Sequence, residues 1–300
     1  MRAWWIAGLL GICGMAGMSP VTAQDFDKVE IRTEKLADGV YMLAGQGGNI
    51  GLGIGEDAAF LIDDQYAPLT PKILAAIAAL TRQPVKFVLN THWHSDHVGG
   101  NENLGKAGSL IVAHDNVRRR MSSEQFIAAF KQKVDPSPKV SLPVVTFAES
   151  VSFHLNGDEI HGFHVASAHT DGDTIVVFRK ANVVHMGDVF FNGTYPFIDL
   201  SSGGSIDGTI AAVDRVLAMI DDRTKVIPGH GPLSDKAGLG AYRRMLAGIR
   251  DRVQAQARAG KSLQETVAAN PSAEFDQVWG KGFLKPAQFV ETVFQSLSGR

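Results

Sequence analysis

The segment that most constrains this chain is Thr91–His97, with the sequence THWHSDH, which holds three histidines and one aspartate directly after a strand-like run. Imidazole nitrogens and a carboxylate oxygen together suit a borderline divalent ion, and zinc is the usual ion for such mixed ligands. His92 and His94 are two residues apart, so on an extended segment their side chains point to the same side and can share one ion. Asp96 and His97 follow at a turn that can direct them to a second ion. The motif therefore predicts a metal site with room for two ions.

Three more candidate ligands follow downstream, each in a short loop that contains glycine or threonine. They are His169 in the sequence AHTDGD, Asp188 in MGD and His230 in PGHG. Each loop follows a strand-like run, which is the arrangement expected when the ends of strands deliver ligands to one edge of a sheet. Together with the first motif, these residues make seven candidate ligands.

The seven residues, in this order, resemble the ligand set of the metallo-β-lactamase superfamily, and the resemblance covers the chain from about Val29 to about Leu233. The resemblance implies an α/β (α+β) fold, the four-layer αβ/βα metallo-β-lactamase sandwich. Strand-rich hairpins followed by helices occur twice along the sequence in roughly mirrored order, which agrees with this architecture. The resemblance also implies an enzyme, a metallo-hydrolase.

Ligand roles follow from the same resemblance, with two zinc ions per chain. The expected ligands of the first zinc ion are His92, His94 and His169. Those of the second zinc ion are Asp96, His97 and His230, and Asp188 is expected to bridge the two ions. Two such ions lower the pKa of a shared water, so the expected nucleophile is a metal-bound hydroxide. Asp96 has a second expected role as a catalytic residue that orients the hydroxide and relays a proton.

The expected function is a zinc-dependent hydrolase that cleaves a carbonyl bond in a β-lactam-like cyclic amide or a related ester or lactone. Asp188 stands where one group of secreted β-lactamases has a cysteine ligand, which favours a generalist hydrolase with some β-lactamase capacity. Two alternatives stay open. One is a redox enzyme with a single iron ion, of the sulfur dioxygenase kind within this superfamily, and the other is a lactonase or thioesterase without β-lactamase activity.

Several further residues are candidate parts of the site. Asp171 and Asp173 flank His169 and are candidate partners for its imidazole, because a metal-bound imidazole usually needs its second nitrogen hydrogen-bonded. The loop 190–198 is a candidate substrate contact, and the glycine-rich tip 45–49 a candidate flap. A single histidine on a strand is more often structural than a ligand, and five are interpreted in that way: His114, His154, His161, His164 and His185.

The first 23 residues are interpreted as a secretory signal peptide. The chain begins with the positive charge of Arg2 and continues with the short apolar segment Ile6–Met18. Small residues up to Ala23 then provide the expected cleavage site. The apolar run is too short and too interrupted by glycine to span a membrane; an uncleaved anchor is the alternative. Cleavage after Ala23 would remove Cys13, the single cysteine, and with it any disulfide or thiolate ligand. A periplasmic or secreted bacterial protein is therefore expected.

The balance of charge limits the choice of partner. Lys and Arg number 29 against 31 for Asp and Glu, so no excess of positive charge attracts a phosphate backbone. The expected partner is a small-molecule substrate, with no nucleic acid and no stable membrane insertion after removal of the signal. Residues 24–235 are expected to form the metallo-β-lactamase-fold domain, and residues 236–300 a helical C-terminal extension packed on the core.

Local patterns predict the individual elements. Antiparallel hairpins are expected over 29–63, a helix that opens at Thr70 with the apolar face Ile73, Leu74, Ile77 and Leu80, and a strand over 85–89. An insertion beside the site is expected over 122–143, with a helical stretch near 124–131. The second half is expected to contain strands over 173–178, 182–186 and 225–227, a helix capped by Asp207, and a last helix near 287–297.

Overall fold

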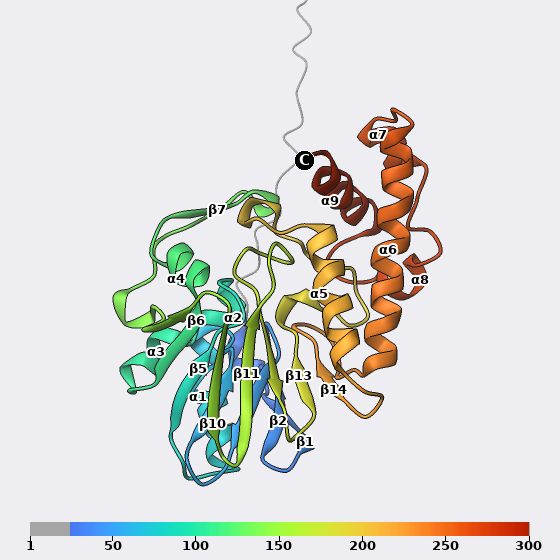
Figure 1. Cartoon of the computed structure of the whole chain (residues 1–300). Helices are drawn as coiled ribbons and strands as arrows, with labels where there is room; N and C mark the ends of the chain where they lie inside the picture. Colours follow the sequence, from blue (N-terminus) through green and yellow to red (C-terminus); the bar gives the residue numbers. More distant parts are fainter. Residues whose placement is uncertain (1–24, 300) are drawn as a thin grey trace, which may run out of the picture.

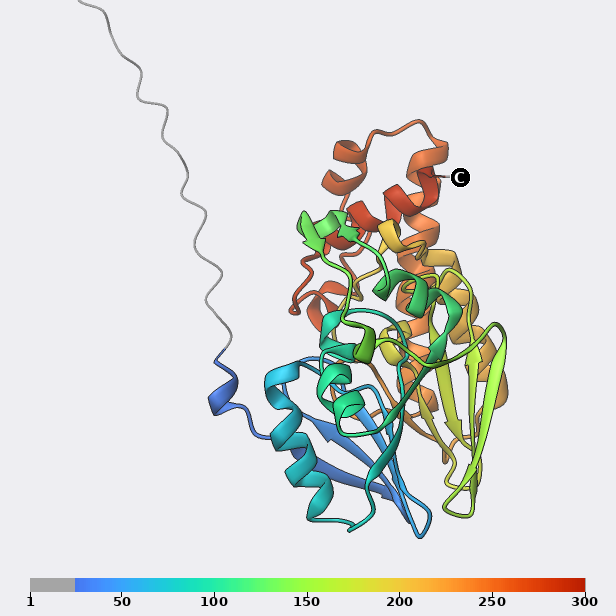
Figure 2. The same cartoon turned by 90° about the vertical axis from the view of Figure 1, so that its left-hand side faces the viewer.

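The structure is a computed structural model that describes residues 25–299. Two β-sheets lie face to face, and helices cover the outer face of each sheet (Figures 1 and 2). This arrangement confirms the expected four-layer sandwich. The predicted signal peptide lies outside the described residues. Within the described residues, no helix is both long and apolar enough to cross a membrane.

The first sheet contains seven strands. In spatial order they are β1 (Arg32–Ala37), β2 (Val40–Ala44), β3 (Ile50–Ile54), β4 (Ala59–Ile62), β5 (Val85–Leu89), β6 (Leu110–His114) and β9 (Val145–Phe147). Neighbours from β1 to β4 pair antiparallel, as the predicted hairpins require, whereas β4, β5, β6 and β9 run parallel. The helices of this half are α1 (Thr70–Ala78), α2 (Ser95–Val98), α3 (Asn101–Lys106) and α4 (Asp115–Met121).

The second sheet contains five strands. In spatial order they are β10 (Ser150–Leu155), β11 (Asp158–His164), β12 (Thr174–Phe178), β13 (Val183–His185) and β14 (Lys225–Ile227). The turn between β10 and β11 places Asn156 and Gly157 at φ 56° and 71°, as a two-residue hairpin turn requires. The helices of this half are α5 (Ile206–Met219), α6 (Lys236–Arg258), α7 (Leu263–Ala268), α8 (Asp276–Trp279) and α9 (Pro286–Ser298).

Alternate residues of each strand face opposite layers, and this alternation builds separate cores. Phe60 and Ile62 of β4 point between the sheets, where they meet Val176 and Phe178 of β12 in one buried cluster. Leu61 lies between Phe60 and Ile62 in the sequence, and its side chain points to the opposite face of the sheet, into a second cluster under α1. A strand with apolar residues on both faces can only be central in a layered sandwich, and β4 and β12 occupy that place.

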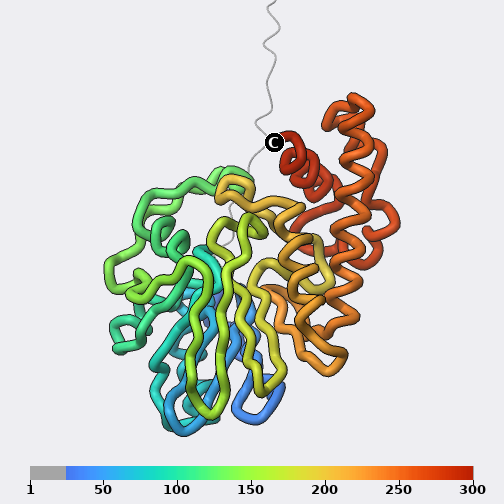
Figure 3. Tube along the Cα trace, viewed as in Figure 1, coloured from blue at the N-terminus to red at the C-terminus, as the bar shows by residue number. Residues whose placement is uncertain are grey.

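The C-terminal helices pack on the outer face of the second sheet. One stripe of α6 is fully buried and consists of Tyr242, Met245, Leu246, Ile249 and Val253. They share one cluster with residues of α5, β13, β14 and α9, and the helices stand together at one side of the molecule (Figure 3). A division of the chain at residue 235 stays a prediction.

Three predicted details are wrong. The stretch near 124–131 is not an α-helix: β7 (Gln125–Ile127) and β8 (Gln132–Val134) form an antiparallel hairpin, and only its turn, Ala128–Phe130, is a short 3-10 helix. The reason is that Ile127 is buried in the core below the hairpin. Ser205, rather than Asp207, caps α5 by accepting a hydrogen bond from the Gly208 amide. Leu74 is one-third exposed, since only the Ile73 and Ile77 side of α1 meets the sheet.

Candidate metal centre

All seven predicted ligands lie together at one edge of the sandwich, in the segments that follow β5, β11, β13 and β14. His92, His94, Asp96 and His97 follow β5 and lie before or within α2, whose position is seen in Figure 1. In the second sheet, β11 and β13 both run antiparallel to β12, and β14 runs parallel to β13. The three loops after β11, β13 and β14 therefore open at one edge, and they carry His169, Asp188 and His230.

The first group of ligands consists of three buried imidazoles. One nitrogen from each of His92, His94 and His169 lies within 4.8 Å of the others. Nδ1 of His94 is 2.9 Å from Nε2 of His169, and the rings of His92 and His94 stand at 89° to each other. Convergent imidazoles without an ion between them would be costly to bury, and their arrangement suits one shared metal ion.

The second group contains Asp96, His97 and His230, whose ligand atoms also lie within 4.8 Å of one another. Nε2 of His230 is 3.3 Å from Oδ2 of Asp96 and 3.4 Å from Nε2 of His97. Asp188 lies between the two groups. Its Oδ1 is 3.0 Å from Nε2 of His97, while its Oδ2 is 3.6 Å from Nε2 of His169. The structure thus brings all seven side chains together, with the aspartate in the position of a bridge.

A polar partner orients each of the buried imidazoles. The hydroxyl of Thr91 lies 3.0 Å from Nδ1 of His92, and the backbone carbonyl of Phe197 lies 2.7 Å from Nδ1 of His169. In each ring the other nitrogen, Nε2, faces the centre. Second partners of this kind fix the tautomer and the ring orientation of metal-binding histidines.

Two carboxylates that the sequence analysis did not identify serve as such partners. Asp63, at the end of β4, lies 2.8 Å from Nδ1 of His97 and accepts hydrogen bonds from the Thr91 backbone amide and hydroxyl. Asp199 lies 3.1 Å from Nε2 of His94. The pair of acidic residues after the apolar run 58–62 was a signal for Asp63, because charged residues rarely follow a buried strand without a partner. Nothing in the local sequence distinguishes Asp199.

The electrostatics divide the histidines into two kinds. Burial lowers the pKa of His169 to about 4, and burial together with the nearby His97 lowers the pKa of His92. Burial also acts to lower the pKa of His230, but the carboxylates of Asp188 and Asp96 raise it to about 9. Against the same effect of burial, Asp188 and Asp96 raise the pKa of His97. His92 and His169 of the first group are therefore neutral near pH 7, whereas His97 and His230 of the second group are paired with carboxylates.

Two observations show that the residues present fit a metal ion. Nε2 of His92 is buried and has no hydrogen-bond partner among the described residues, although such an atom normally has one. Glycine makes room for the ligands at two places. A Cβ at Gly48 would lie 2.1 Å from Cε1 of His97, and a Cβ at Gly229 would lie 2.1 Å from Oδ1 of Asp188. Divalent zinc suits the combination of imidazole and carboxylate donors.

The other predicted site residues have different positions. Asp173 accepts hydrogen bonds from the backbone amides of His169 and Thr170, so it holds the loop and does not contact the imidazole. Asp171 forms a bidentate pair with Arg120, with nitrogen–oxygen distances of 2.7 and 2.8 Å, because the loop turns its side chain toward α4. The predicted partners of the His169 imidazole are therefore wrong.

The five histidines interpreted as structural lie outside the group of seven. His185, for example, is buried and bonds to the Asn49 carbonyl and the Gly187 amide. His114 stacks on His164, with ring centroids 3.7 Å apart. His154 is exposed on β10. None of the five belongs to a group of possible metal ligands found among the described residues.

The loop 190–198 and the tip 45–49 differ from expectation in part. Tyr195 is buried, stacks on Phe289 and donates a hydrogen bond to Asp276, so it holds the C-terminal helices instead of facing the centre. Phe197 does lie beside the centre, 5.7 Å from the His169 ring. The tip is tied down, since the Asn49 amide donates to the Gly229 carbonyl at 2.7 Å and the Gly48 amide donates to the Asp96 carbonyl at 3.1 Å. The tip 45–49 therefore forms a fixed wall of the candidate metal centre.

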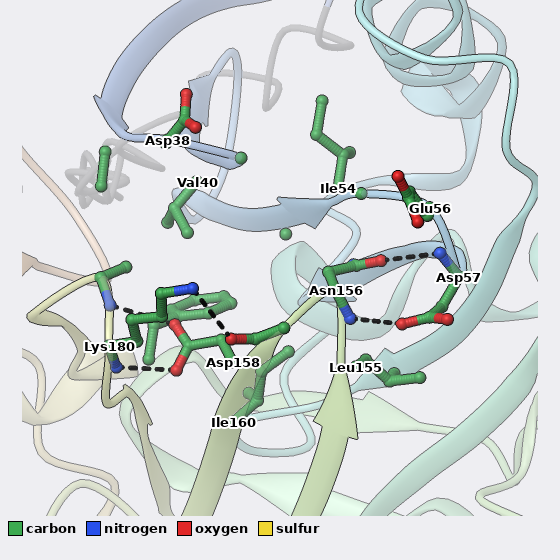
Figure 4. Close-up of a pocket in the computed structure, with 17 residues that line it drawn as sticks. Asp38, Val40, Ile54, Glu56, Asp57, Leu155, Asn156, Asp158, Ile160 and Lys180 are labelled. Atoms are coloured by element: carbon green, nitrogen blue, oxygen red, sulfur yellow. Dashed lines mark hydrogen bonds between the residues drawn. The ribbon is translucent and has the colours of Figure 1, made fainter.

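A cavity of about 600 Å³ lies elsewhere, between the hairpin turns around Gly39, Asp57 and Gly157. Figure 4 shows that its polar groups are paired with one another: Asn156 bonds to Asp57, and Asp158 accepts from the backbone of Lys180. None of the seven ligands lines it. This cavity is therefore separate from the candidate metal centre.

Comparisons with known proteins agree with this geometry. The model of the family described as the metallo-beta-lactamase superfamily matches residues 45–231. The beta-lactamase-like protein 2 homolog of Caenorhabditis elegans is 29% identical over 68% of this chain and 65% of its own length. A hydroxyacylglutathione hydrolase of Pelagibacter ubique is 27% identical over 49% of this chain and 52% of its own length. The chain thus spans about two thirds of the first relative and half of the second.

A solved structure shows the same fold. The metallo-beta-lactamase from Pontibacter korlensis superposes with a TM-score of 0.60 at 20% identity, over 73% of this chain and 99% of that protein. At this identity the likeness concerns the fold alone. The sandwich, the clustered ligands at its edge and a family match over more than half of the residues lead to one conclusion: this chain belongs to the metallo-beta-lactamase superfamily.

Proposed function

We propose that this protein is a zinc-dependent hydrolase that cleaves a carbonyl bond in a cyclic amide, an ester or a lactone. The main observation behind this proposal is that Asp188 lies between two groups of three candidate ligands and close to a histidine of each group. A catalytic zinc ion binds three protein ligands and keeps a position open. Six ligands with one shared carboxylate therefore favour two ions, and the hydrolase named among the relatives supports the reaction class.

Bound divalent ions would supply the chemistry of water activation and carbonyl polarisation. The residues decide where a substrate can approach. Asp96 and His230 are the ligands with accessible side chains, 21% and 28% exposed, whereas the Asp188 side chain is 5% exposed. A substrate therefore reaches the centre from the side of Asp96 and His230.

Asp96 is suited to hold and relay a proton on that accessible side. Burial acts to raise its pKa, but the His97 imidazole and the hydrogen bond from His230 lower it to about 2. The carboxylate is therefore ionised at neutral pH and can accept a proton from a water or pass one to a leaving group. The tip 45–49, which is bonded to the Asp96 carbonyl through the Gly48 amide, holds the backbone of this residue in place.

A single iron ion with redox chemistry is the competing function. The group His92, His94 and His169 with Asp188 offers enough donors for one such ion. However, the remaining group of Asp96, His97 and His230 would then be an assembled ligand set without an ion. The number of ions per chain separates the two functions directly.

The test is metal analysis of the purified protein, followed by turnover of a chromogenic cephalosporin, a chromogenic ester and a lactone, with and without chelator. We expect two zinc ions per chain and cleavage of at least one substrate that stops with chelator. One iron ion per chain, with no chelator-sensitive hydrolysis, would contradict the proposal.

His94→Ala is the matching variant. It removes a ligand of the first group and should abolish turnover and release metal while the circular dichroism spectrum stays that of the parent. His154→Ala, at an exposed histidine of β10, is the control and should keep activity and metal. Full activity of His94→Ala would contradict the ligand assignment.

Export is part of the proposal. Cleavage after Ala23 would release a chain without cysteine that acts on small molecules in the periplasm or outside the cell. Fractionation of the expressing bacterium, with N-terminal sequencing of the purified protein, is the test. A protein found in the cytoplasm with residues 1–23 intact would contradict this part and leave the hydrolase proposal standing.

A further inference from the structure

A groove of about 470 Å³ opens beside the metal centre, between three segments that are distant in sequence. One wall is the turn 128–130 between β7 and β8, another is the stretch 197–201, and the third is formed by Phe283, Leu284 and the first turns of α9. Figure 1 shows β7 and α9 at the same end of the molecule. The size is within the usual range for small-molecule sites.

Aromatic rings connect the groove with the centre. The Phe197 ring lies 5.9 Å from the His94 ring and 5.7 Å from the His169 ring. Phe130 lies 4.8 Å from Phe197 on the other side, and Phe283 lies 5.7 Å from Phe130. The series of rings therefore leads from two metal-ligand candidates to the outer end of the groove. Uncharged polar side chains also line the groove, namely Ser201, Gln288, Thr292 and Gln295.

The outer rings are exposed although they touch each other. Phe283 is 73% exposed and Phe130 40%. Large apolar side chains that gather at the surface next to a site usually mark a place where a ligand is bound. The inner wall is firmly held, since the Phe197 carbonyl is bonded to His169 and the Asp199 carboxylate to His94.

The charges of the groove exclude one class of ligand. No lysine or arginine lines it among the described residues. Its acidic groups already have partners: Asp199 accepts from Ser202 and lies against His94, and Glu291 accepts from Gln295 at 3.1 Å. A carboxylate on the bound arm would find no cation there and would lie near two like charges, which is unfavourable.

We propose that this groove binds the apolar, uncharged arm of the substrate, an alkyl or aryl group, while the carbonyl bond lies at the metal centre. The inference rests on the proposed hydrolase function and narrows its substrates to esters, lactones or amides with such an arm. Phe130 and Phe283 are then the residues that determine specificity, because the arm gains free energy for each part of its surface that the rings remove from water.

The test measures the affinity of the zinc-loaded protein for straight-chain alkyl hydroxamates from two to eight carbons by calorimetry. All members share a metal-binding head group and differ only in the apolar arm. We expect affinity to rise roughly threefold to fourfold with each methylene that the groove buries. Phe130→Ala combined with Phe283→Ala should reduce affinity for the eight-carbon member about tenfold or more, with little change for the two-carbon member.

Phe126→Ala is the matched control, because Phe126 is 57% exposed on the same hairpin but does not line the groove. It should keep the dependence on chain length. Equal affinities along the series in the parent protein, with clear binding of the two-carbon member, would overturn the groove proposal and leave the metal centre intact. An unchanged dependence in the double variant would overturn it as well.

Failure of the proposed hydrolase function would give a result that differs from failure of the groove proposal. If the two-carbon hydroxamate does not bind, the proposed function fails, and a neutral fluorescent probe, N-phenyl-1-naphthylamine, then tests the groove alone in protein with or without metal. Probe binding that the double variant abolishes and Phe126→Ala retains would support the groove. Probe binding that is equal in all three proteins, or absent from the parent, would overturn it.

Discussion

The His97 imidazole lies between two carboxylates that act in different ways. Asp188 faces its Nε2 at 3.0 Å, on the side of the centre, whereas Asp63 faces its Nδ1 at 2.8 Å from behind. Asp63 also accepts hydrogen bonds from the backbone amide and the hydroxyl of Thr91, the residue directly before His92. One buried carboxylate thus positions both ligand groups, and this makes Asp63 the most informative residue outside the ligand set.

Asp63→Asn removes the charge while it keeps the shape and tolerates the positive φ of 63° at this position. The amide cannot accept three hydrogen bonds at the same two atoms, so the His97 ring should lose its fixed orientation. We expect metal affinity to fall by roughly tenfold to 100-fold, measured by competition with a chromogenic chelator. Asp38→Asn, at an exposed aspartate that pairs with Lys35, is the control. An unchanged affinity would show that Asp63 is not a positioning residue.

Replacement of Gly48 would test the two proposed zinc ions separately. The missing side chain of Gly48 leaves space for the His97 ring, since a Cβ would lie 2.1 Å from Cε1. Gly48→Ala should therefore displace His97 and lower the zinc content from two ions to one, because the group of His92, His94 and His169 is untouched. Elemental analysis after dialysis against a weak chelator measures this change.

The control for Gly48→Ala is Gly240→Ala, inside α6, where a Cβ meets nothing closer than 3.7 Å. It should keep both ions and stabilise the fold by roughly 0.5–1 kcal/mol, because alanine has a higher helix propensity than glycine. Two ions retained in Gly48→Ala would contradict the role of this close approach.

At the scale of single elements, the start of α5 shows how local chemistry sets a boundary. Ser205 has extended backbone angles and its hydroxyl accepts from the Gly208 amide at 3.0 Å. It also donates to the Ser167 carbonyl at 2.8 Å, which fastens the helix to the loop that carries His169. Asp207 lies inside the first turn and pairs with Arg250 of α6, so the acidic residue connects two helices instead of ending one.

Ser205→Ala should lower the free energy of unfolding by about 1 kcal/mol, the usual cost of a lost helix cap. Urea unfolding followed by circular dichroism measures this, and the metal content should stay near two ions per chain. Ser298→Ala, at an exposed hydroxyl near the end of α9, should change stability by much less. A loss no greater than that of the Ser298 variant would show that the cap contributes nothing measurable.

The hairpin of β7 and β8 illustrates why short elements are hard to predict. Helical and extended patterns are similar over the few residues of 124–131, and the choice is made by contacts outside this stretch. Ile127 is buried in a cluster with Trp93 and Val117, and the Ala128 amide donates to the Ser201 hydroxyl at 3.2 Å. Tertiary contacts of this kind regularly override local propensity.

For the whole molecule, the fold and the metal centre depend on different parts of the chain. Buried apolar clusters lie between the sheets and under the helices, while the ligands stand in loops at one edge. Chelation should therefore lower the melting temperature and leave a cooperatively folded protein. Free metal at 100 times its Kd would contribute about 2.7 kcal/mol.

Thermal unfolding with and without chelator, together with far-ultraviolet circular dichroism at 25 °C, checks this prediction. The spectrum should be the same in both samples and only the midpoint should move. Loss of secondary structure on chelation at 25 °C would show that the metal ions, and not the apolar clusters, hold the sandwich together.

The sequence alone was sufficient for the seven clustered residues, because each stands in a recognisable local motif. The layered fold followed from the resemblance of these motifs to a known family, and local patterns agree with it. Strands such as β4 and β12 are apolar on both faces, which only a central position explains. Candidate ligands such as His169 and Asp188 stand in glycine-containing loops that follow strands β11 and β13. Strand direction then brings them to one edge, so local patterns and topology lead to the same site.

Only the tertiary structure decided which residues support and surround that site. Asp199 meets His94 across 105 positions of the chain, and Phe130, Phe197 and Phe283 form one groove from three separate segments. Asp171, a neighbour of His169 in sequence, turns away to Arg120. Such contacts are set by how distant segments pack, and packing leaves no periodic trace in the residues themselves. The candidate ligands were therefore readable in the sequence, whereas their partners and the groove proposed for the substrate were not.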